Sequence, residues 1–373
     1  MEWRLIKSGP LDPLSIHAIY ESIARSVSEG RSPNTLHICW PKEPYVCVGI
    51  HQVVELEVDI NQCKKQNLPI IRRQIGGGAV YLDPDQFFYH IIINKKDAPL
   101  DLRKLFSMFL RPTICTYRKF GLDAKYKPIN DVVINGKKVS GNGAATFDDA
   151  IVIVGNVILD FNPDVFASIL RVPDEKIRDK LVKSMEEWVS SLRKELGYKP
   201  QMKTVENYYM QCFKKIFNAK FIESSLNPYE TKIMSDLKRR YSEDTWTYKY
   251  RYKHSKLLER LSGPQRVIKI MEGHYVVHVV EKMDKLIRVL AEIKNNKILD
   301  IFISGDFFLQ PLEVADYIEK CLKNMSLDEI KNMKVENLLR DFEAKNIPPM
   351  TKRFIEQILV AVSKIEDYLP KRH

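Results

Sequence analysis

Residues 72–83 read Arg-Arg-Gln-Ile-Gly-Gly-Gly-Ala-Val-Tyr-Leu-Asp and combine two residue types that bind anions. The three glycines at 76–78 have no Cβ, so the backbone can turn tightly and approach a ligand closely. Successive N–H groups in such a turn can form an anion-binding nest, and Arg72 and Arg73 add planar, permanently charged forks beside it. We therefore predict a strand–loop–strand site for a phosphate or a carboxylate here. The alternative is a purely structural hairpin turn.

The same stretch lacks the features of two common phosphate-binding loops. No Gly-Lys-Ser/Thr follows the glycines, which excludes a Walker loop. Their spacing does not fit a dinucleotide-binding fingerprint, and no helix is expected after them. The rest of the chemistry must therefore come from another part of the chain.

A second informative stretch, residues 130–141, predicts a β-hairpin that carries a lysine and a carboxylate. An Asn-Gly pair between two β-rich runs favours a type I′ turn, which fixes the register. In that register Val133 lies opposite Lys138 and Asp131 opposite Ser140, so Lys138 and Asp131 form a diagonal pair roughly 7–8 Å apart. The lysine can hold a phosphate oxygen or a carbonyl, and the carboxylate can hold Mg²⁺ with phosphate oxygens. A surface hairpin with a weak ion pair is the alternative.

Three other features surround these motifs. Residues 140–145 are small, which favours close approach of a ligand. Gly155 interrupts an apolar run at 151–159 and indicates a bulge or a ligand pressed against the backbone. His90 lies in the apolar run 86–93, which is typical of a strand buried on both faces, so a core histidine is favoured over a catalytic one.

Composition and length indicate a globular protein of two domains. The chain has 373 residues, of which 45% are hydrophobic and 29% charged, and no long apolar window predicts a membrane span. The first residues resemble neither a signal peptide nor a transit peptide, so a cytoplasmic location is expected. The six cysteines form no C-x-x-C pair, which predicts reduced thiols rather than a disulfide framework or a zinc site.

The formal charge of +11 favours an acidic partner, either nucleic acid or protein. We find no RNA-binding signature and no helix-turn-helix pattern, so we expect no nucleic acid partner. An acidic protein remains, and a solvated lysine-rich surface is the alternative.

Hydrophobic periodicity predicts the elements that position these residues. Helices are expected at 11–29, 55–65, 101–120, 312–324, 335–345 and 351–368. Strands are expected at 36–40, 45–49, 86–93, 151–159, 286–293 and 297–304. The composition changes at about residue 246, where residues 245–249 look like the end of a linker.

Taken together, these motifs resemble the lipoate–protein ligase A family. The matching residues are Arg72-Arg73-x-x-Gly-Gly-Gly-Ala-Val-Tyr-x-Asp, then Asn130-Asp131-Val132 and Lys138-Val139-Ser140-Gly141, in the family's order and spacing. Residues 48–52 are similar to the family's Gly-x-x-Gln, and residues 171–197 also fit. Residues 305–308, Gly-Asp-Phe-Phe, resemble a segment of the family's accessory C-terminal domain.

The resemblance implies a fold and a division into domains. We expect an α/β (α+β) fold like that of class II synthetases, with a mixed, largely antiparallel sheet flanked by helices. Residues 1–245 would form the lipoate/biotin ligase-like catalytic domain. Residues 246–373 would form a smaller α+β accessory domain.

The resemblance also implies a two-step reaction. ATP and Mg²⁺ convert lipoate to lipoyl-AMP, and the lipoyl group then passes to a lysine of an acceptor. The acceptors would be acidic lipoyl domains of 2-oxoacid dehydrogenase E2 or the glycine-cleavage H protein. Carried over by motif, Lys138 is the catalytic residue, Asp131 holds the metal, and Gly77, Gly78, Lys138 and Gly141 contact lipoate. ATP and lipoyl-AMP are assigned to Arg72, Arg73, Gly76, Gly77, Gly78, Ala79, Val80, Tyr81, Asn130, Asp131 and Lys138.

One segment has both a packing interpretation and a functional one. Leu181, Met185, Trp188, Leu192 and Leu196 follow a helical stripe that is typical of core packing. In the family, the corresponding stretch includes an adenylate-binding loop. We therefore hypothesise that 174–184 is poorly ordered without ligand.

The sequence departs from the family pattern at two histidines. Leu82 stands where the family often has His, and residues 154–156 stand where it has His-Gly-Thr, so neither histidine serves as a base here. Water or phosphate would then take the proton of the attacking lysine.

Several rival functions remain at this point. An octanoyltransferase of the same fold uses a cysteine near the segment after the family lysine, and residues 138–170 contain none. A lipoyl amidotransferase keeps the lysine, and a biotin ligase would carry a different glycine-rich pattern. Outside the enzymes, the rivals are a non-catalytic lipoyl-domain binder and a basic nucleic-acid-binding module.

Overall fold

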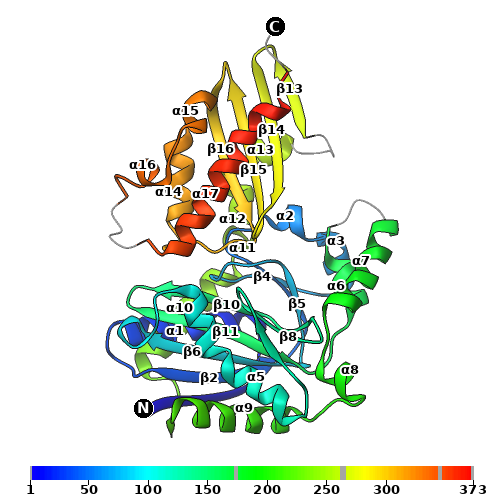
Figure 1. Ribbon diagram of the computed structural model, residues 1–373, viewed down its shortest axis with the longest axis vertical. Helices are drawn as coiled ribbons and strands as arrows, with labels where there is room; N and C mark the ends of the chain where they lie inside the picture. Colours follow the sequence, from blue (N-terminus) through cyan, green and yellow to red (C-terminus); the bar gives the residue numbers. More distant parts are fainter. Residues whose placement is uncertain (1, 172–174, 261–265, 343–346, 371–373) are drawn as a thin grey trace. The chain divides into compact units, whose positions relative to one another are not determined.

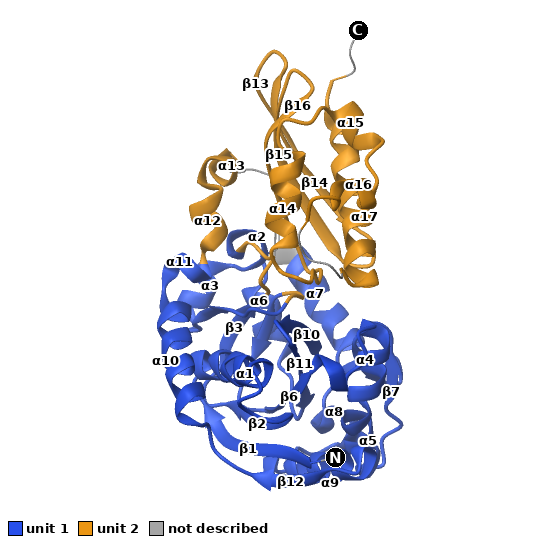
Figure 2. Ribbon diagram, turned by 90° about the vertical axis from the view of Figure 1, so that its left-hand side faces the viewer, with its two compact units in different colours: residues 1–48, 54–75, 79–247 blue, residues 49–53, 76–78, 248–373 orange. Residues whose placement is uncertain are grey.

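The computed structural model describes residues 2–171, 175–260, 266–342 and 347–370, which form two compact units. Unit 1 comprises Met1–Val48, Val54–Ile75 and Ala79–Thr247, and unit 2 comprises Gly49–Val53, Gly76–Gly78 and Tyr248–His373 (Figure 2). The main division therefore follows residue 247, close to the expected boundary. Within the described ranges we find no helix with the length and apolar character that a bilayer crossing requires.

Unit 1 is built on a six-stranded sheet with the order β10-β11-β6-β2-β1-β12 (Figure 1). Its strands are β1 (Glu2–Leu11), β2 (Thr35–Pro41), β6 (Gln86–Asn94), β10 (Asn142–Phe147), β11 (Ala150–Ile158) and β12 (Lys220–Glu223). Neighbours from β10 to β2 run antiparallel, whereas β2, β1 and β12 run parallel. The expected mixed, largely antiparallel sheet flanked by helices is confirmed.

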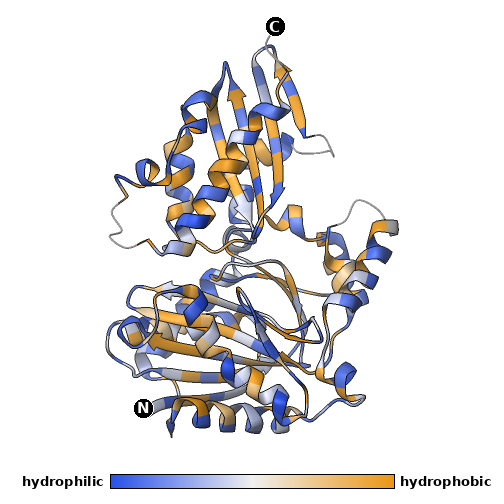
Figure 3. Ribbon diagram, in the orientation of Figure 1, coloured by the Kyte–Doolittle hydropathy of each residue, from blue (hydrophilic) through white to orange (hydrophobic). Residues whose placement is uncertain are grey.

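Helices cover both faces of this sheet, as the continuous apolar run of β6 predicts. Trp3, Phe87 and Tyr89 on one face pack in a core with side chains from α4, α5 and α9, whereas Ile6 and Ile92 on the other face pack with side chains from α1. Alternating hydrophobic and hydrophilic bands along α9 in Figure 3 show its amphipathic character. These helices are α1 (Pro13–Ser28), α4 (Leu102–Phe109), α5 (Arg111–Lys119) and α9 (Met202–Phe217).

The other elements of unit 1 are short. Two three-stranded sheets have the orders β4-β3-β5 and β7-β8-β9. Their strands are β3 (Tyr45–Val48), β4 (Ile70–Arg72), β5 (Val80–Leu82), β7 (Lys125–Lys127), β8 (Asp131–Ile134) and β9 (Lys137–Ser140). The helices are α2 (Val54–Glu57), α3 (Ile60–Lys65), the 3₁₀ helix η1 (Lys95–Asp97), α6 (Pro163–Ile169), α7 (Glu175–Trp188), α8 (Leu192–Leu196), α10 (Pro228–Ser242) and α11 (Asp244–Thr247).

Several predicted elements differ from the observed ones. The helix expected at 101–120 divides into α4 and α5, because Pro112 at the start of α5 has no N–H to continue the helix before it. The helix expected at 55–65 is two short helices, since Asp59 caps α3 by accepting from the N–H of Gln62. Residues 245–249 are not a linker, because α11 continues to residue 247.

The expectation that all six cysteines are reduced is wrong, because Cys115 and Cys212 form a disulfide. The two residues are 97 positions apart in the sequence, so their spacing gives no sign of pairing. They meet because α5 and α9 pack side by side on one face of the sheet, with Cα atoms 5.8 Å apart. The other cysteines, Cys39, Cys47, Cys63 and Cys321, are free thiols, as expected.

Replacing Cys115 and Cys212 together with serine is expected to lower the free energy of unfolding by about 2–4 kcal/mol. The bond closes a long loop in the unfolded chain, and its loss frees that loop. Urea titration of the double variant and the wild type measures the difference. The single variant Cys63→Ser, which alters an unbonded thiol, is the control, and a double variant no less stable than this control would contradict the prediction.

Unit 2 contains an antiparallel sheet with the order β13-β14-β15-β16 and helices that pack on it. The strands are β13 (Val267–Met271), β14 (His274–Lys282), β15 (Leu286–Lys294) and β16 (Lys297–Gly305), and the hairpin predicted around 295–296 is confirmed. The helices are α12 (Lys249–Lys253), α13 (Ser255–Arg260), α14 (Val314–Leu322), α15 (Leu327–Lys331), α16 (Val335–Leu338), α17 (Pro349–Ser363) and the 3₁₀ helix η2 (Lys364–Tyr368). The helix expected at 335–345 ends at Leu338, and residues 343–346 lie outside the described ranges.

Candidate functional site

The hairpin of β8 and β9 carries the lysine that the sequence singles out. Its turn residues Asn135 and Gly136 both have positive φ, 49° and 81°, as the type I′ turn requires. Val133 lies opposite Lys138 as predicted, but the register then shifts and Val132 lies opposite Ser140. The predicted pairing of Asp131 with Ser140 is therefore wrong.

The register shift is a β-bulge with a clear packing cause. Val132 and Val139 are both fully buried in the core that also contains Trp3 and Tyr117. A bulge places one extra residue on one strand and bends it, which lets both valines reach that core. Lys138, which lies next to the bulge, is therefore on a strand that the buried Val139 anchors in the core.

Lys138 and Asp131 make direct contact. Nζ of Lys138 lies 2.7 Å from Oδ1 of Asp131, and the two side chains are 40% and 30% exposed. The predicted diagonal pair is confirmed, with its charged ends closer than the backbone positions suggest. A half-exposed ion pair contributes little to stability, so the ammonium can exchange a carboxylate partner for a phosphate oxygen at small cost.

Three hydrogen bonds, two of them through the side chain of Tyr117, hold the Lys138 strand in place. The N–H of Ser190 donates to the carbonyl of Lys138 at 2.8 Å. The buried hydroxyl of Tyr117 on α5 donates to the carbonyl of Val139 and accepts from the N–H of Ile158 at 3.1 Å. Tyr117 thus joins the hairpin to β11 of the large sheet.

Replacing Tyr117 with phenylalanine is expected to slow the first chemical step by about tenfold. The change leaves a buried carbonyl and a buried N–H without a partner, which costs about 1–3 kcal/mol and loosens the strand next to Lys138. Lipoate-dependent exchange between pyrophosphate and ATP measures the rate, and urea titration measures the stability. The exposed Tyr198→Phe is the control. An unchanged rate in Tyr117→Phe would show that the hydroxyl does not position the lysine.

Asn130 and Gly141, both predicted to bind substrate, take part in a hydrogen-bond network behind the lysine. The side-chain amide of Asn130 donates to the carbonyl of Asn142, and the side-chain amide of Asn142 donates back to the carbonyl of Asn130 at 2.8 Å. The N–H of Gly141 donates to Oδ1 of Asn156 at 2.7 Å. These contacts fix the ends of the hairpin, and a role for either residue in ligand binding stays a prediction.

Gly155 needs no ligand to explain it. The register between β6 and β11 is continuous through Gly155, so no bulge is present. A Cβ at this position would lie 2.1 Å from Oδ1 of Asn142 and 2.2 Å from the hydroxyl oxygen of Tyr89. The predicted bulge is absent. The side chains of Asn142 and Tyr89, which hydrogen-bond to each other at 2.5 Å, occupy the space beside Gly155 where a ligand was expected.

The glycine-rich loop is a crossover and not a hairpin turn. Strands β4 and β5, which precede and follow it, both pair with β3 and lie on opposite sides of it. The structural-hairpin alternative is thus wrong. Ala79, Val80 and Tyr81 follow the glycines at the start of β5 and are half-buried.

The two arginines before the glycines have different surroundings. Arg72 is fully buried, and its Nε donates to the carbonyls of Trp246 and Thr247 at 3.2 and 2.9 Å. Arg73 is half-buried, and its Nη1 donates to the carbonyl of Cys47 at 3.3 Å. We therefore assign Arg72 a structural contact and keep Arg73 as the candidate for the anion.

Within unit 2, the glycine loop packs against the Gly-Asp-Phe-Phe segment. A Cβ on Gly76 would lie 2.5 Å from the carbonyl oxygen of Phe307. Gly77 has a φ of 97°, and its carbonyl oxygen would lie 2.1 Å from a Cβ on Gly49. The nearest atom to a Cβ on Gly78 is 3.9 Å away. A protein contact thus accounts for Gly76 and a positive φ accounts for Gly77, whereas a Cβ at Gly78 would meet only an ordinary contact.

The segment that was expected to order on the nucleotide is only partly described. Residues 172–174 lie outside the described ranges, and α7 begins at 175, so ligand-dependent ordering of 174–184 stays a prediction. The packing stripe is wrong at Trp188, which is 61% exposed, because α7 ends there and a separate helix begins at Leu192.

Sequence reasoning missed Tyr117, Ser190 and Asn142, the residues that support the Lys138 hairpin. Tyr117 lies within a helical pattern that gives no sign of a distant partner. Asn142 carries a weak signal, since it stands between two glycines and its side-chain amide can hydrogen-bond to the backbone.

The sequence of this chain matches that of a known protein family. Residues 12–214, more than half of the chain, match the lipoyl protein ligase A/B catalytic domain. The chain belongs to that family. It is therefore an enzyme of the lipoate ligase and octanoyltransferase type, and the predicted family is confirmed.

The relatives of this family member include both kinds of enzyme. It is 24% identical to the octanoyltransferase LipM of Moorella thermoacetica over 65% of this chain and 97% of the relative. It is 28% identical to lipoate-protein ligase A subunit 1 of Thermoplasma acidophilum over 61% of this chain and 88% of the relative.

A solved structure supports the fold. The bi-partite lipoate protein ligase of T. acidophilum, solved in a study that also covered its E2 lipoyl domain, superposes with a TM-score of 0.61 at 27% identity. The match covers 66% of this chain and 96% of that chain.

Proposed function

We propose that this family member is an ATP-dependent lipoate–protein ligase, which forms lipoyl-AMP and then transfers the lipoyl group to a lysine of an acceptor protein. The observation that carries the proposal is the Lys138–Asp131 pair on an anchored hairpin, in a chain with no thiol near that lysine in sequence. An anionic intermediate needs such a cation, whereas a thioester route needs a cysteine nucleophile.

The sequence after Lys138 offers no thiol, and three cysteines elsewhere in the chain are poor nucleophiles. Residues 138–170 contain no cysteine. Cys115 is in a disulfide, and burial raises the pKa of the thiols of Cys39 and Cys47. A thiol held protonated in this way is a poor nucleophile.

In the first step, the lipoate carboxylate attacks the α-phosphorus of ATP, and pyrophosphate leaves. Both reactants are negatively charged, so their approach is opposed by repulsion. The Lys138 ammonium and the Arg73 guanidinium would relieve it by binding the oxygens on which charge accumulates. In the second step, the acceptor amine attacks the acyl carbon and AMP leaves, with the carbonyl oxygen held by Lys138.

The residues present fit a Mg²⁺ ion bound with the nucleotide. Asp131 offers a half-exposed carboxylate at the start of β8, and Mg²⁺ is usually held by one or two carboxylates together with phosphate oxygens and water. When bound, the ion would neutralise phosphate charge. The pairing of Asp131 with Lys138 also keeps the lysine oriented before substrates arrive.

The acceptor we propose is an acidic lipoyl domain, and the surface of unit 1 suits it. A groove of about 890 Å³ between α5 and α9 is lined by Arg111, Arg118, Lys119 and Lys215. None of these four side chains forms an ion pair with a residue that the structure describes. Cations without an acidic neighbour of this kind attract an acidic partner and raise its association rate.

The runner-up is an octanoyltransferase that acts without ATP, which the identity to LipM favours. Intact-mass analysis of a lipoyl domain separates the two functions. We expect modification with lipoate, ATP and Mg²⁺, and none with octanoyl carrier protein alone. Modification from the carrier protein without ATP would favour the transferase.

A further inference from the structure

Two histidines and a cysteine lie together between the six-stranded sheet and helix α1. His37 and Cys39 are two residues apart on β2, so their side chains leave the same face, and His90 lies directly opposite His37 on β6. Nδ1 of His37 is 2.9 Å from Nδ1 of His90. One donor atom from each of the three residues lies within 4.8 Å of the others, and all three residues are buried.

The two imidazoles are hydrogen-bonded to each other through their Nδ1 atoms, so one of these two nitrogens carries a proton. Nε2 of His37 lies 2.9 Å from Oγ of Ser8. If Nε2 of His37 carries its proton and donates it to Ser8, then Nδ1 of His37 is left bare and accepts from the Nδ1–H of His90. An ion that enters the cluster takes the place of this proton, which moves to Nε2 of His90, and both Nδ1 atoms then face the ion.

The charge of the cluster selects the kind of ion. Two neutral imidazoles and one thiolate carry a charge of −1, so a monovalent ion gives a neutral complex, whereas a divalent ion leaves a net charge in an apolar layer. Tyr20 packs edge-on to His90 there, with ring centroids 5.2 Å apart. The charge of Arg4, which also acts on His37, is balanced by Glu230 at 2.5 Å.

We propose that His37, Cys39 and His90 form a three-coordinate site for a monovalent soft metal ion, for which Cu⁺ has the matching charge and ligand preference. On binding, the S–H bond of Cys39 breaks, a sulfur–copper bond forms, and the proton passes to solvent. No electron is transferred. The ion joins β2 to β6 and, because it binds only the folded chain, stabilises it.

The test uses the full-length protein with its disulfide intact. The chain is refolded from urea in anaerobic buffer without thiols, with one equivalent of Cu⁺, and is then challenged with a Cu⁺-specific chelator. We expect one retained copper per chain, a raised melting temperature, and an X-ray absorption spectrum with two nitrogen ligands and one sulfur ligand. Cys39→Ser and His90→Gln should each lose the retained copper, whereas Cys63→Ser, a buried thiol elsewhere, should keep it.

Three outcomes would overturn the proposal. They are copper removed completely from the wild type, copper retained equally by Cys39→Ser, and retention of Zn²⁺ in place of Cu⁺. If the variants fail to fold, the absorption spectrum of the wild type decides, because a ligand set other than two nitrogens and one sulfur contradicts the site.

Discussion

Replacing Lys138 with alanine is expected to lower lipoate-dependent exchange between pyrophosphate and ATP by about 10²–10³-fold. The Lys138 ammonium, held beside Asp131 on the anchored hairpin, can bind both the carboxylate and the phosphate oxygens as they approach. Its loss removes a charge interaction that grows stronger in the transition state, so the rate falls more than substrate binding. The exchange rate at saturating lipoate and ATP is the measurement.

The neighbouring Lys137 provides the matched control. Its Nζ donates to the carbonyl of Glu186 at 3.2 Å, and it lies next to Lys138 on β9, so it carries the same charge on the same strand. Lys137→Ala should retain most of the exchange activity. A similar loss in both variants would show that general surface charge, and not the Lys138 position, supports the reaction.

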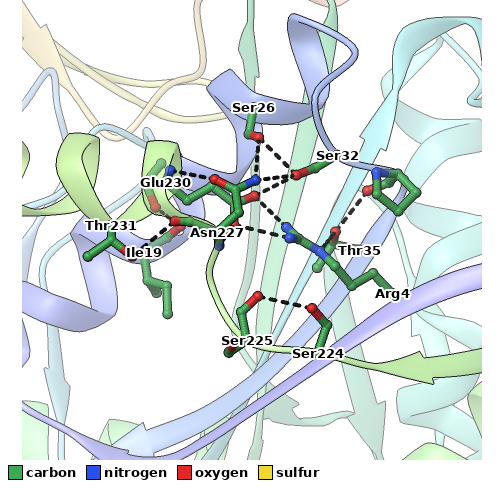
Figure 4. Close-up of polar contacts among 12 residues, drawn as sticks. Arg4, Ile19, Ser26, Ser32, Thr35, Ser224, Ser225, Asn227, Glu230 and Thr231 are labelled. Carbon is green, nitrogen blue, oxygen red and sulfur yellow. Dashed lines mark hydrogen bonds and ion pairs between the residues drawn. The ribbon is translucent and has the colours of Figure 1, made fainter.

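Replacing Glu230 with glutamine is expected to lower the free energy of unfolding by about 3–5 kcal/mol, because it leaves Arg4 buried without a counter-charge. Figure 4 shows the carboxylate between Arg4, Ser32 and Asn227. Arg4 donates to both of its oxygens at 3.0 and 2.5 Å, and the two side chains are 8% and 0% exposed. The same carboxylate accepts from the N–H of Asn227 in the cap of α10.

A more exposed ion pair that also involves β1 supplies the comparison. Lys7 on β1 pairs with Glu223 on β12 at 2.5 Å, but the side chains are 33% and 69% exposed. Glu223→Gln should change stability by less than about 1 kcal/mol. Urea titration of both variants measures the contrast, and equal effects would mean that the buried pair contributes no more than a surface pair.

The parts of the fold that could be predicted depend on local patterns. The Asn-Gly turn at 135–136 set the hairpin and the pairing of Val133 with Lys138, since a type I′ turn determines register next to itself. The same reasoning failed two residues further along, where burial of Val139 introduced a bulge. The residues of a turn do not indicate how side chains further along the strands must pack in the core.

The parts that could not be predicted depend on long-range contacts. Cys115 and Cys212 meet only because α5 and α9 cover the same face of the sheet, and Tyr117 reaches Val139 for the same reason. The glycines at 76–77 looked like ligand contacts, yet the carbonyl of Phe307 accounts for Gly76 and a positive φ accounts for Gly77. Sequence shows that a residue is small, and only the fold shows what fills the space beside it.

The most direct test of the proposed ligase is the exchange of labelled pyrophosphate into ATP by the wild-type chain with lipoate and no acceptor protein. If the chain activates a carboxylate as its adenylate, label enters ATP only when lipoate is present, and the Lys138→Ala variant loses that activity. No exchange with lipoate or octanoate, in a preparation that still acylates a lipoyl domain from an acyl carrier protein, would contradict the account.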